Sequence, residues 1–280
     1  MTKNIALLSS LSLIAAATYL DNKLLKVSKY NVKSTKIPKE FDKFKIIQLS
    51  DFHNYKFLGK DNNIVVNKIN EENPDIIVMT GDMVNKYDRN FKNFFALTEV
   101  LSKKYELYYI VGNHEKRLKK DYFNFFIERL EKLGIKILTD KKITIIRKKD
   151  YINIYGMDIP LSYYKTNNKP SNINDIVDTA LNKCNEKEYN ILLAHNPLYF
   201  DIYAKHNVDL TLSGHVHGGM IRLPFIGGVL SPERKFFPKY NSGIYSINNK
   251  KLIVSRGMGH SKPGIRIFNM PEIVSITLFN

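Results

Sequence analysis

Two histidines one residue apart stand out in the segment Leu212-Ser213-Gly214-His215-Val216-His217-Gly218-Gly219, which follows a predicted strand over 208–213. On an extended backbone, residues i and i+2 project to the same side, so His215 and His217 face one site if the strand ends near Gly214. The flanking glycines let the backbone turn sharply and approach an ion closely. The pair therefore indicates a metal site, with a polar turn between two strands as the alternative.

Four earlier predicted strands also end in residues that bind metals. They cover residues 44–49, 75–80, 106–111 and 190–194, and each is rich in apolar residues. Apolar residues with helical spacing separate the first three strands, which is the pattern of an α/β sheet. Side chains that follow the strands of such a sheet meet at one edge, where sites form. The residues concerned are Asp51, His53, Asp82, Asn113, His114 and His195.

Together with the histidine pair, these strand ends offer too many ligands for one ion. Two divalent cations about 3.5 to 4 Å apart, sharing a bridging carboxylate, are the economical arrangement, and such a pair clamps a phosphoryl group. Taken singly, each residue has a more ordinary interpretation, because an Asp after a strand often caps a helix and a lone His is often a core residue. Five such strand ends in one chain favour the metal centre.

Composition limits the metals and the partners. The only cysteine, Cys184, excludes a thiolate cluster, so the ligands are imidazole, carboxylate and amide oxygen, which suit Mn, Fe, Zn or Mg. The chain of 280 residues carries a formal net charge of +16, which favours anionic partners. Its lysines are scattered, and no nucleic-acid-binding module is recognisable, so no nucleic-acid partner is predicted. A nuclease or a general phosphatase stays an alternative function. Oligomeric state is left open.

The N-terminal region divides into two parts before a catalytic domain over 44–280. Residues 1–22 contain an apolar run that would span about 24 Å as a helix, against a hydrocarbon core of about 30 Å. A membrane anchor and a cleaved signal, which would give a secreted protein, both fit this run, as does an ordinary helix. Residues 23–43 are expected to form a basic linker whose lysines contact anionic headgroups. Those lysines favour the cytoplasmic face, but the face stays open.

Five blocks of the chain resemble the signature of the calcineurin-like metallophosphoesterase family, over about residue 44 to the C-terminus. They are Asp51-x-His53, Gly81-Asp82, Gly112-Asn113-His114-Glu115, Ala194-His195 and Gly214-His215-Val216-His217. The resemblance implies an α/β fold, a four-layer α/β/β/α sandwich of two mixed sheets, with a dinuclear metal centre at the strand ends. It also implies hydrolysis of a phosphodiester or pyrophosphate bond by a metal-bridging hydroxide, a nucleophile available near pH 7.

The same resemblance assigns a role to each residue of the centre. The first metal is expected on Asp51, His53 and His217, the second on Asn113, His195 and His215, and both on Asp82 as the bridge. His114 is expected to contact the scissile phosphate and to assist the leaving oxygen. His206 lies in a predicted helix and is excluded from the site.

The segments that flank these blocks resemble a bacterial branch of small, membrane-linked phosphodiesterases, which includes enzymes similar to UDP-diacylglucosamine pyrophosphatases. The segments are 218–224, 231–232, 237–240, 255–259 and 271–273. This resemblance implies a phosphate-containing substrate that is lipid-linked or nucleotide-linked, and a membrane surface as partner. A membrane-surface scaffold that binds metals without turnover is the alternative from another class. The complete ligand set, including His114, argues against it.

Further residues are predicted around the pocket. Arg222, Arg256 and His260 are expected to contact phosphate, because Arg presents a bidentate fork to phosphate oxygens. His260 fits a surface position equally well. A group of apolar residues either forms a rim for an acyl chain or a nucleobase, or packs a hairpin. The group consists of Phe225, Ile226, Phe236 and Phe237.

Overall fold

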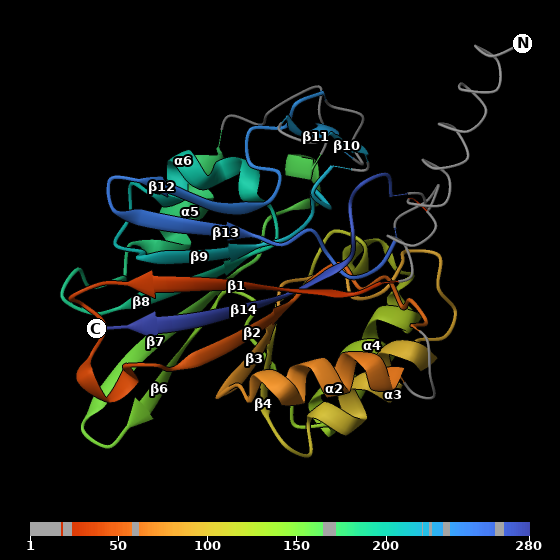
Figure 1. Ribbon diagram of the computed structural model, residues 1–280, viewed down its shortest axis with the longest axis horizontal. Coiled ribbons are helices and arrows are strands. Elements are labelled where there is room, and N and C mark those ends of the chain that lie inside the picture. The colour runs from red at the N-terminus through yellow and green to blue at the C-terminus, as the bar shows by residue number, and fades with distance from the viewer. Residues whose placement is uncertain are drawn as a thin grey trace, which may run out of the picture.

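Two mixed six-stranded sheets pack face to face, and helices cover the outer face of each (Figure 1). The computed structural model describes residue 18 and residues 24–57, 62–164, 172–219, 221–223, 226–231, 236–260 and 266–280. The four layers predicted from the family resemblance, α/β/β/α, are confirmed.

The first sheet has the strand order β1-β14-β2-β3-β4-β5. Its strands are β1 (Lys26–Lys33), β14 (Glu272–Phe279), β2 (Lys45–Leu49), β3 (Ile76–Met79), β4 (Glu106–Tyr109) and β5 (Lys136–Ile137). The strands from β2 to β5 are parallel, whereas β14 runs antiparallel to β2 and parallel to β1. Its outer face is covered by α2 (Asn63–Glu72), α3 (Lys92–Leu101) and α4 (Lys120–Lys132).

The second sheet has the order β12-β13-β9-β8-β7-β6. Its strands are β12 (Gly243–Ile247), β13 (Lys250–Val254), β9 (Leu210–Ser213), β8 (Asn190–Ala194), β7 (Asp150–Met157) and β6 (Lys141–Arg147). The four inner strands are parallel, and a hairpin closes each edge. Helices α5 (Ile173–Leu181) and α6 (Phe200–Tyr203) cover its outer face. A separate ribbon consists of β10 (Ile221–Leu223) and β11 (Gly227–Leu230).

The inner strands are buried on both faces, which is why their sequences are continuously apolar. Successive side chains alternate between two cores. In β2, Ile46 packs between the sheets, where it joins Val78 of β3 and Leu212 of β9, while Ile47 packs under the helices with Ile77. The core between the sheets packs β2 and β3 against β9, and the carboxyl ends of the three strands face the same region.

The segment 23–43 is not simply a linker. Residues 26–33 form β1, which pairs along its whole length with β14, and both Ile37 and Phe41 are fully buried between the sheets. The prediction failed because the lysines of this segment suggested solvated chain. In fact β1 is an edge strand, and its lysines Lys26, Lys29 and Lys33 are exposed on it. Lysine on an edge strand discourages pairing with a further strand.

The predicted apolar segment 1–22 lies outside the described residues apart from residue 18. Within the described ranges, none of the helices has the length and apolarity required to cross a bilayer.

Candidate metal centre

The predicted ligands converge where strands of both sheets end. Those from the first sheet follow β2, β3 and β4, and those from the second follow β8 and β9. All seven are buried, with exposed fractions between 0% and 7%. They are Asp51, His53, Asp82, Asn113, His195, His215 and His217.

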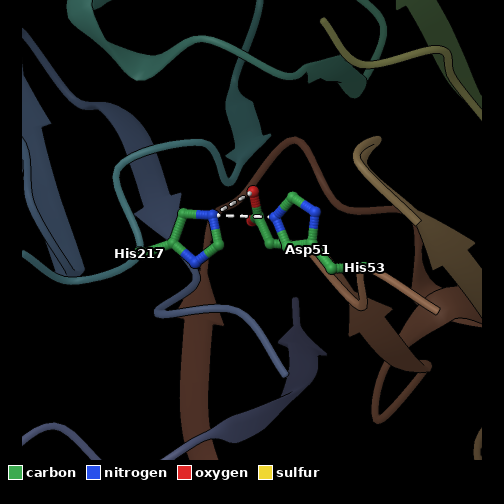
Figure 2. A group of neighbouring side chains, drawn as sticks. All are labelled: Asp51, His53 and His217. Carbon is green, nitrogen blue, oxygen red and sulfur yellow. Dashed lines mark hydrogen bonds and ion pairs between the residues drawn. The ribbon is translucent and has the colours of Figure 1, made fainter. Parts of the chain in front are cut away.

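The first group of ligands combines the loop after β2 with the loop after β9. Asp51, His53 and His217 offer ligand atoms that all lie within 4.8 Å of one another. Figure 2 shows the two imidazoles directed at each other beside the carboxylate. His53 Nε2 lies 3.0 Å from His217 Nε2, which in turn lies 3.3 Å from Asp51 Oδ1. Two ring nitrogens this close need a proton or a cation between their lone pairs.

The second group adjoins the first. Asp82, His195 and His215 also offer ligand atoms within 4.8 Å of one another. His195 Nδ1 donates to the carbonyl of Thr80 at 2.6 Å, which leaves Nε2 for a metal. This Nε2 lies 3.2 Å from Asp82 Oδ2 and 4.0 Å from Asp51 Oδ1, so His195 stands between the two groups.

The donor atoms fit divalent cations. In the part of the chain that the structure describes, Asn113 Oδ1 is buried without a hydrogen-bond partner. Buried polar atoms are rarely left unpaired, so this oxygen, among nitrogen and oxygen ligands, is consistent with coordination. The predicted bridging role of Asp82 agrees with its place beside His195, and it stays a prediction.

Electrostatics at the centre depend on burial and on the carboxylates. Burial lowers the pKa of the His53 imidazole to about 3, so its ring is neutral and keeps a lone pair. Burial alone would also lower the pKa of His195, but the adjacent Asp82 carboxylate raises it to about 9. A cation that binds to His195 therefore displaces a proton.

Five ligands lie on left-handed backbone, a conformation that costs a residue with a Cβ about 1 kcal/mol. Their φ angles are 50° at Asp51, 51° at His53, 53° at Asp82, 72° at His215 and 54° at His217. The predicted extended arrangement of the histidine pair is therefore wrong. β9 ends at residue 213, and the tight turns that follow it direct the two imidazoles into different groups. Such strain is typical of functional sites.

His114 borders the first group and is only partly buried. Its ring meets the His53 ring edge-on, with 4.7 Å between centroids, and its backbone N–H donates to Asp82 Oδ1 at 2.7 Å. Burial lowers the pKa of the imidazole. The backbone N–H of Lys86 points at Nδ1 from 3.4 Å, which assigns the ring proton to Nε2.

Two buried residues without a predicted role position the ligand loops. Glu115 accepts hydrogen bonds from the backbone N–H groups of Gly112 at 2.9 Å, Asp82 at 3.0 Å and Val84 at 3.1 Å, so it ties the loops after β3 and β4 together. Asn269 Nδ2 donates to the carbonyl of His217 at 2.6 Å and to that of residue 219 at 2.7 Å. Glu115 belongs to a quoted motif, whereas no local pattern marks Asn269.

Arg266 is a third residue that the sequence analysis missed. It is 3% exposed, and its Nη2 lies 3.3 Å from His217 Nδ1, on the far side of that ring from the first group. Burial lowers its pKa to about 10, so the guanidinium stays charged at neutral pH. A permanent cation therefore stands behind one metal ligand.

The predicted phosphate-contacting residues have other partners. Arg256 makes a buried ion pair with Glu272, through Nε at 2.9 Å and Nη2 at 2.7 Å. Arg222 donates to the carbonyl of residue 218 and to Asn241. His260 packs edge-on against Tyr55, with 4.8 Å between ring centroids. Phosphate contact by these residues stays a prediction.

Comparisons with known proteins agree with this geometry. The family described as calcineurin-like phosphoesterase matches residues 44–219. An uncharacterized metallophosphoesterase of Aquifex aeolicus is 32% identical, over 95% of this chain and 96% of the relative. The metallophosphoesterase YkuE of Bacillus subtilis, also uncharacterized, is 29% identical over 94% and 88%. Phosphodiesterase YaeI of Escherichia coli is 27% identical over 84% and 82%. The chain belongs to the calcineurin-like phosphoesterase family and is a metal-dependent hydrolase of phosphoric esters.

Proposed function

We propose that this hydrolase cleaves a phosphodiester or pyrophosphate bond in a lipid-linked or nucleotide-linked substrate, with two divalent cations bound at the adjoining groups. The observation that carries the proposal is the pair of buried triads, with His114 at their more exposed margin. Each triad offers three ligands to one cation. Because His195 lies close to both Asp82 and Asp51, the two triads adjoin, and cations bound at both could contact the same phosphoryl group.

The residues of the centre divide the work. Asp51, His53 and His217 would hold one cation, and the second group together with Asn113 would hold the other. When bound, the two cations offset charge on the phosphoryl oxygens and acidify water to near-neutral pKa. His114 donates a hydrogen bond from Nε2 to a phosphoryl or leaving oxygen, because its Nδ1 faces a backbone N–H. Because the metal ligands are buried, bulk water does not reach the centre from the interior of the domain.

The finer substrate class draws on four further features. A relative bears the name phosphodiesterase, the flanking segments resemble enzymes that cleave a lipid-linked UDP-sugar, and the net charge of +16 suits an anionic surface. The apolar run within residues 1–22 would associate the protein with a membrane. Together they favour a phosphate group presented at a bilayer.

A comparison of three substrates tests the reaction. The protein, reconstituted in turn with Mn, Fe, Zn and Mg, is assayed on an aryl phosphodiester, an aryl phosphomonoester and a UDP-sugar lipid. We expect turnover of the diester or of the pyrophosphate, and faster turnover of the lipid substrate. Hydrolysis of the monoester alone would overturn the diesterase proposal, and no turnover with any metal would favour a scaffold.

Variants of the centre separate metal binding from chemistry. Asp82→Asn is expected to lose turnover and to lower the occupancy of both metals, whereas His114→Gln keeps the metals and loses rate. His206→Gln is the matched control, because His206 Nε2 pairs with Asp178 at 3.1 Å, away from the ligands. Elemental analysis measures the metals. An Asp82→Asn protein with full metal content and normal activity would refute the bridging assignment.

A further inference from the structure

Large apolar side chains lie exposed on the ribbon that follows the metal-binding histidines. Ile226, Phe236 and Phe237 are 60%, 71% and 63% exposed, and Leu223 is 41% exposed. The backbone keeps them on one small unit, because residue 236 bridges to residue 230 of β11 and Phe237 N–H donates to the carbonyl of Val229. These four residues are here called the apolar ribbon; Phe225, which the sequence groups with three of them, lies outside the described residues. A concentration of exposed apolar side chains commonly marks an interaction surface.

The apolar ribbon is attached directly to the metal centre. Asn269 donates hydrogen bonds to the carbonyls of His217 and residue 219. The strand β10, which carries Leu223, begins two residues after residue 219. Arg222 N–H then donates to the carbonyl of Ile267 at 3.0 Å, which anchors β10 to the same C-terminal segment. Figure 1 shows β10 and β11 outside both sheets. The ribbon therefore projects from the edge of the domain that carries the ligands.

The chain enters the domain at this same edge. β14 runs antiparallel to β2, so its first residue, Glu272, lies where β2 ends and the ligands begin. β1 runs parallel to β14, and its first residue, Lys26, pairs with Glu272. Leu24, two residues before β1, is 50% exposed. The apolar run of residues 5–20 is therefore joined to the domain on the side of the apolar ribbon and the metal centre.

We infer that the apolar ribbon docks into the surface of a phospholipid bilayer, next to the point where residues 1–22 join the domain, so that the metal centre faces the headgroups. This inference rests on the membrane association proposed above. Aromatic and aliphatic side chains are the usual anchors at that depth. Exposed Lys26, at the start of β1, lies at the same edge and suits anionic headgroups. A net charge of +16 disfavours a second copy of the chain as the occupant.

The consequence concerns the substrate. A phosphoester that is part of a membrane lipid would reach the centre at headgroup level, without leaving the bilayer. A soluble nucleotide would gain nothing from the docking surface. The inference therefore selects the lipid-linked class from the two that the proposed function leaves open.

Site-specific fluorescence on the full chain tests the docking. Ile226→Cys is labelled with a polarity-sensitive fluorophore, and Ile146→Cys is the matched control. Ile146 is 70% exposed near the β6–β7 turn, at the end of the second sheet away from the ligands. The native Cys184 is buried and escapes labelling. Vesicles of phosphatidylcholine and phosphatidylglycerol, three to one, carry a spin-label quencher on the acyl chains. We expect quenching at position 226 to exceed that at position 146 at least threefold.

A variant of the surface adds a second measurement. Flotation of the same samples reports total vesicle binding, and we expect the double variant Phe236→Ser/Phe237→Ser to lower vesicle affinity about tenfold, because two apolar rings lose their burial in lipid. Phe125→Ser, which removes a 52% exposed ring from α4, is the control and should bind as the parent does.

Each outcome decides a different claim. Flotation with equal quenching at the two positions would overturn the docking and leave the membrane association intact. No flotation of any variant would overturn both. A change in the fluorescence of position 226 that depends on protein concentration and needs no vesicles would assign the surface to a second copy. None of these results bears on hydrolase activity, so the proposed reaction is tested independently.

Discussion

The amide of Asn269 is expected to hold the histidine loop in its metal-binding shape. Asn269 is fully buried, and its Nδ2 donates to the carbonyls of His217 and residue 219. Asn269→Ala leaves two buried carbonyls without a donor. Each unpaired carbonyl costs about 1.5 kcal/mol. Removal of Asn269 Oδ1, which is itself unpaired among the described residues, returns about 1 kcal/mol, so the free energy of unfolding should fall by about 2 kcal/mol.

Another buried asparagine provides the control. Asn190 is also fully buried, and its Nδ2 donates to the carbonyls of Asn185 and Asn207, at the start of β8 and therefore at the opposite end of the strand from His195. Asn190→Ala should lose at least as much free energy of unfolding, because the Asn190 amide also bonds Glu188 and Asn153. Only Asn269→Ala should weaken divalent-metal binding, by about tenfold, as is usual when a group that supports a ligand is removed.

Two measurements distinguish the variants. Thermal unfolding in the presence of a chelator should show a fall in Tm of about 4–8 °C for Asn269→Ala, given about 2–4 °C per kcal/mol in a domain of this size, and at least as large a fall for Asn190→Ala. Calorimetric titration with Mn or Zn should then separate them. Equal metal affinities for the two variants would refute a role of Asn269 in positioning His217, and an unchanged Tm for Asn269→Ala would refute the hydrogen-bond estimate.

Three further predictions follow from the structure. Gly112→Ala should lose turnover at least a hundredfold and lower Tm, because a Cβ there would overlap the carboxylate of the neighbouring ligand loop; a parent-like melting curve and rate would contradict this. Burial alone would raise the pKa of Glu72, but hydrogen bonds from Lys29 and a serine lower it below 4.5. The stabilisation that ionised Glu72 provides is therefore present above pH 4.5 and lost as the pH falls through the folded-state pKa. Denaturant titrations should show Glu72→Gln less stable than the parent at pH 7, and the difference in free energy of unfolding should shrink in acid. A difference that does not change with pH would argue against this linkage. Arg256→Met should cost about 3 kcal/mol by leaving the buried Glu272 carboxylate without a counter-charge, and the double variant Arg256→Met/Glu272→Met should recover most of it; no recovery in chemical denaturation would mean that the pair does not act as a unit.

The ligand positions were predictable because they depend on local sequence. Each follows an apolar run that is buried on both faces, and strands of this kind deliver whatever comes next to one edge of the sheet. The order of the quoted blocks then indicated the family, and with it the four layers. Asp51, Asp82 and His195 are therefore close in space for a reason that is visible in the chain alone.

Long-range pairing was not predictable in the same way. β1 was assigned to a linker because its lysines concealed a strand whose partner is more than two hundred residues away. The left-handed turns at His215 and His217 were missed because a non-glycine residue adopts that backbone only when surrounding contacts impose it. Arg266 supports a ligand from a distant segment, and no periodicity marks it.

The place of β14 constrains how the protein is made. This strand follows every other described strand in the chain, yet it lies between β1 and β2, and the hydrogen bond from Ser28 to Glu272 joins residues 244 positions apart. Until β14 has been synthesised, β1 and β2 have no partner on those edges, so the first sheet closes late. Such non-local closure slows folding and exposes strand edges that chaperones recognise. The loop after β2, with its two metal ligands, therefore takes its final shape late, and metal loading should follow the synthesis of β14.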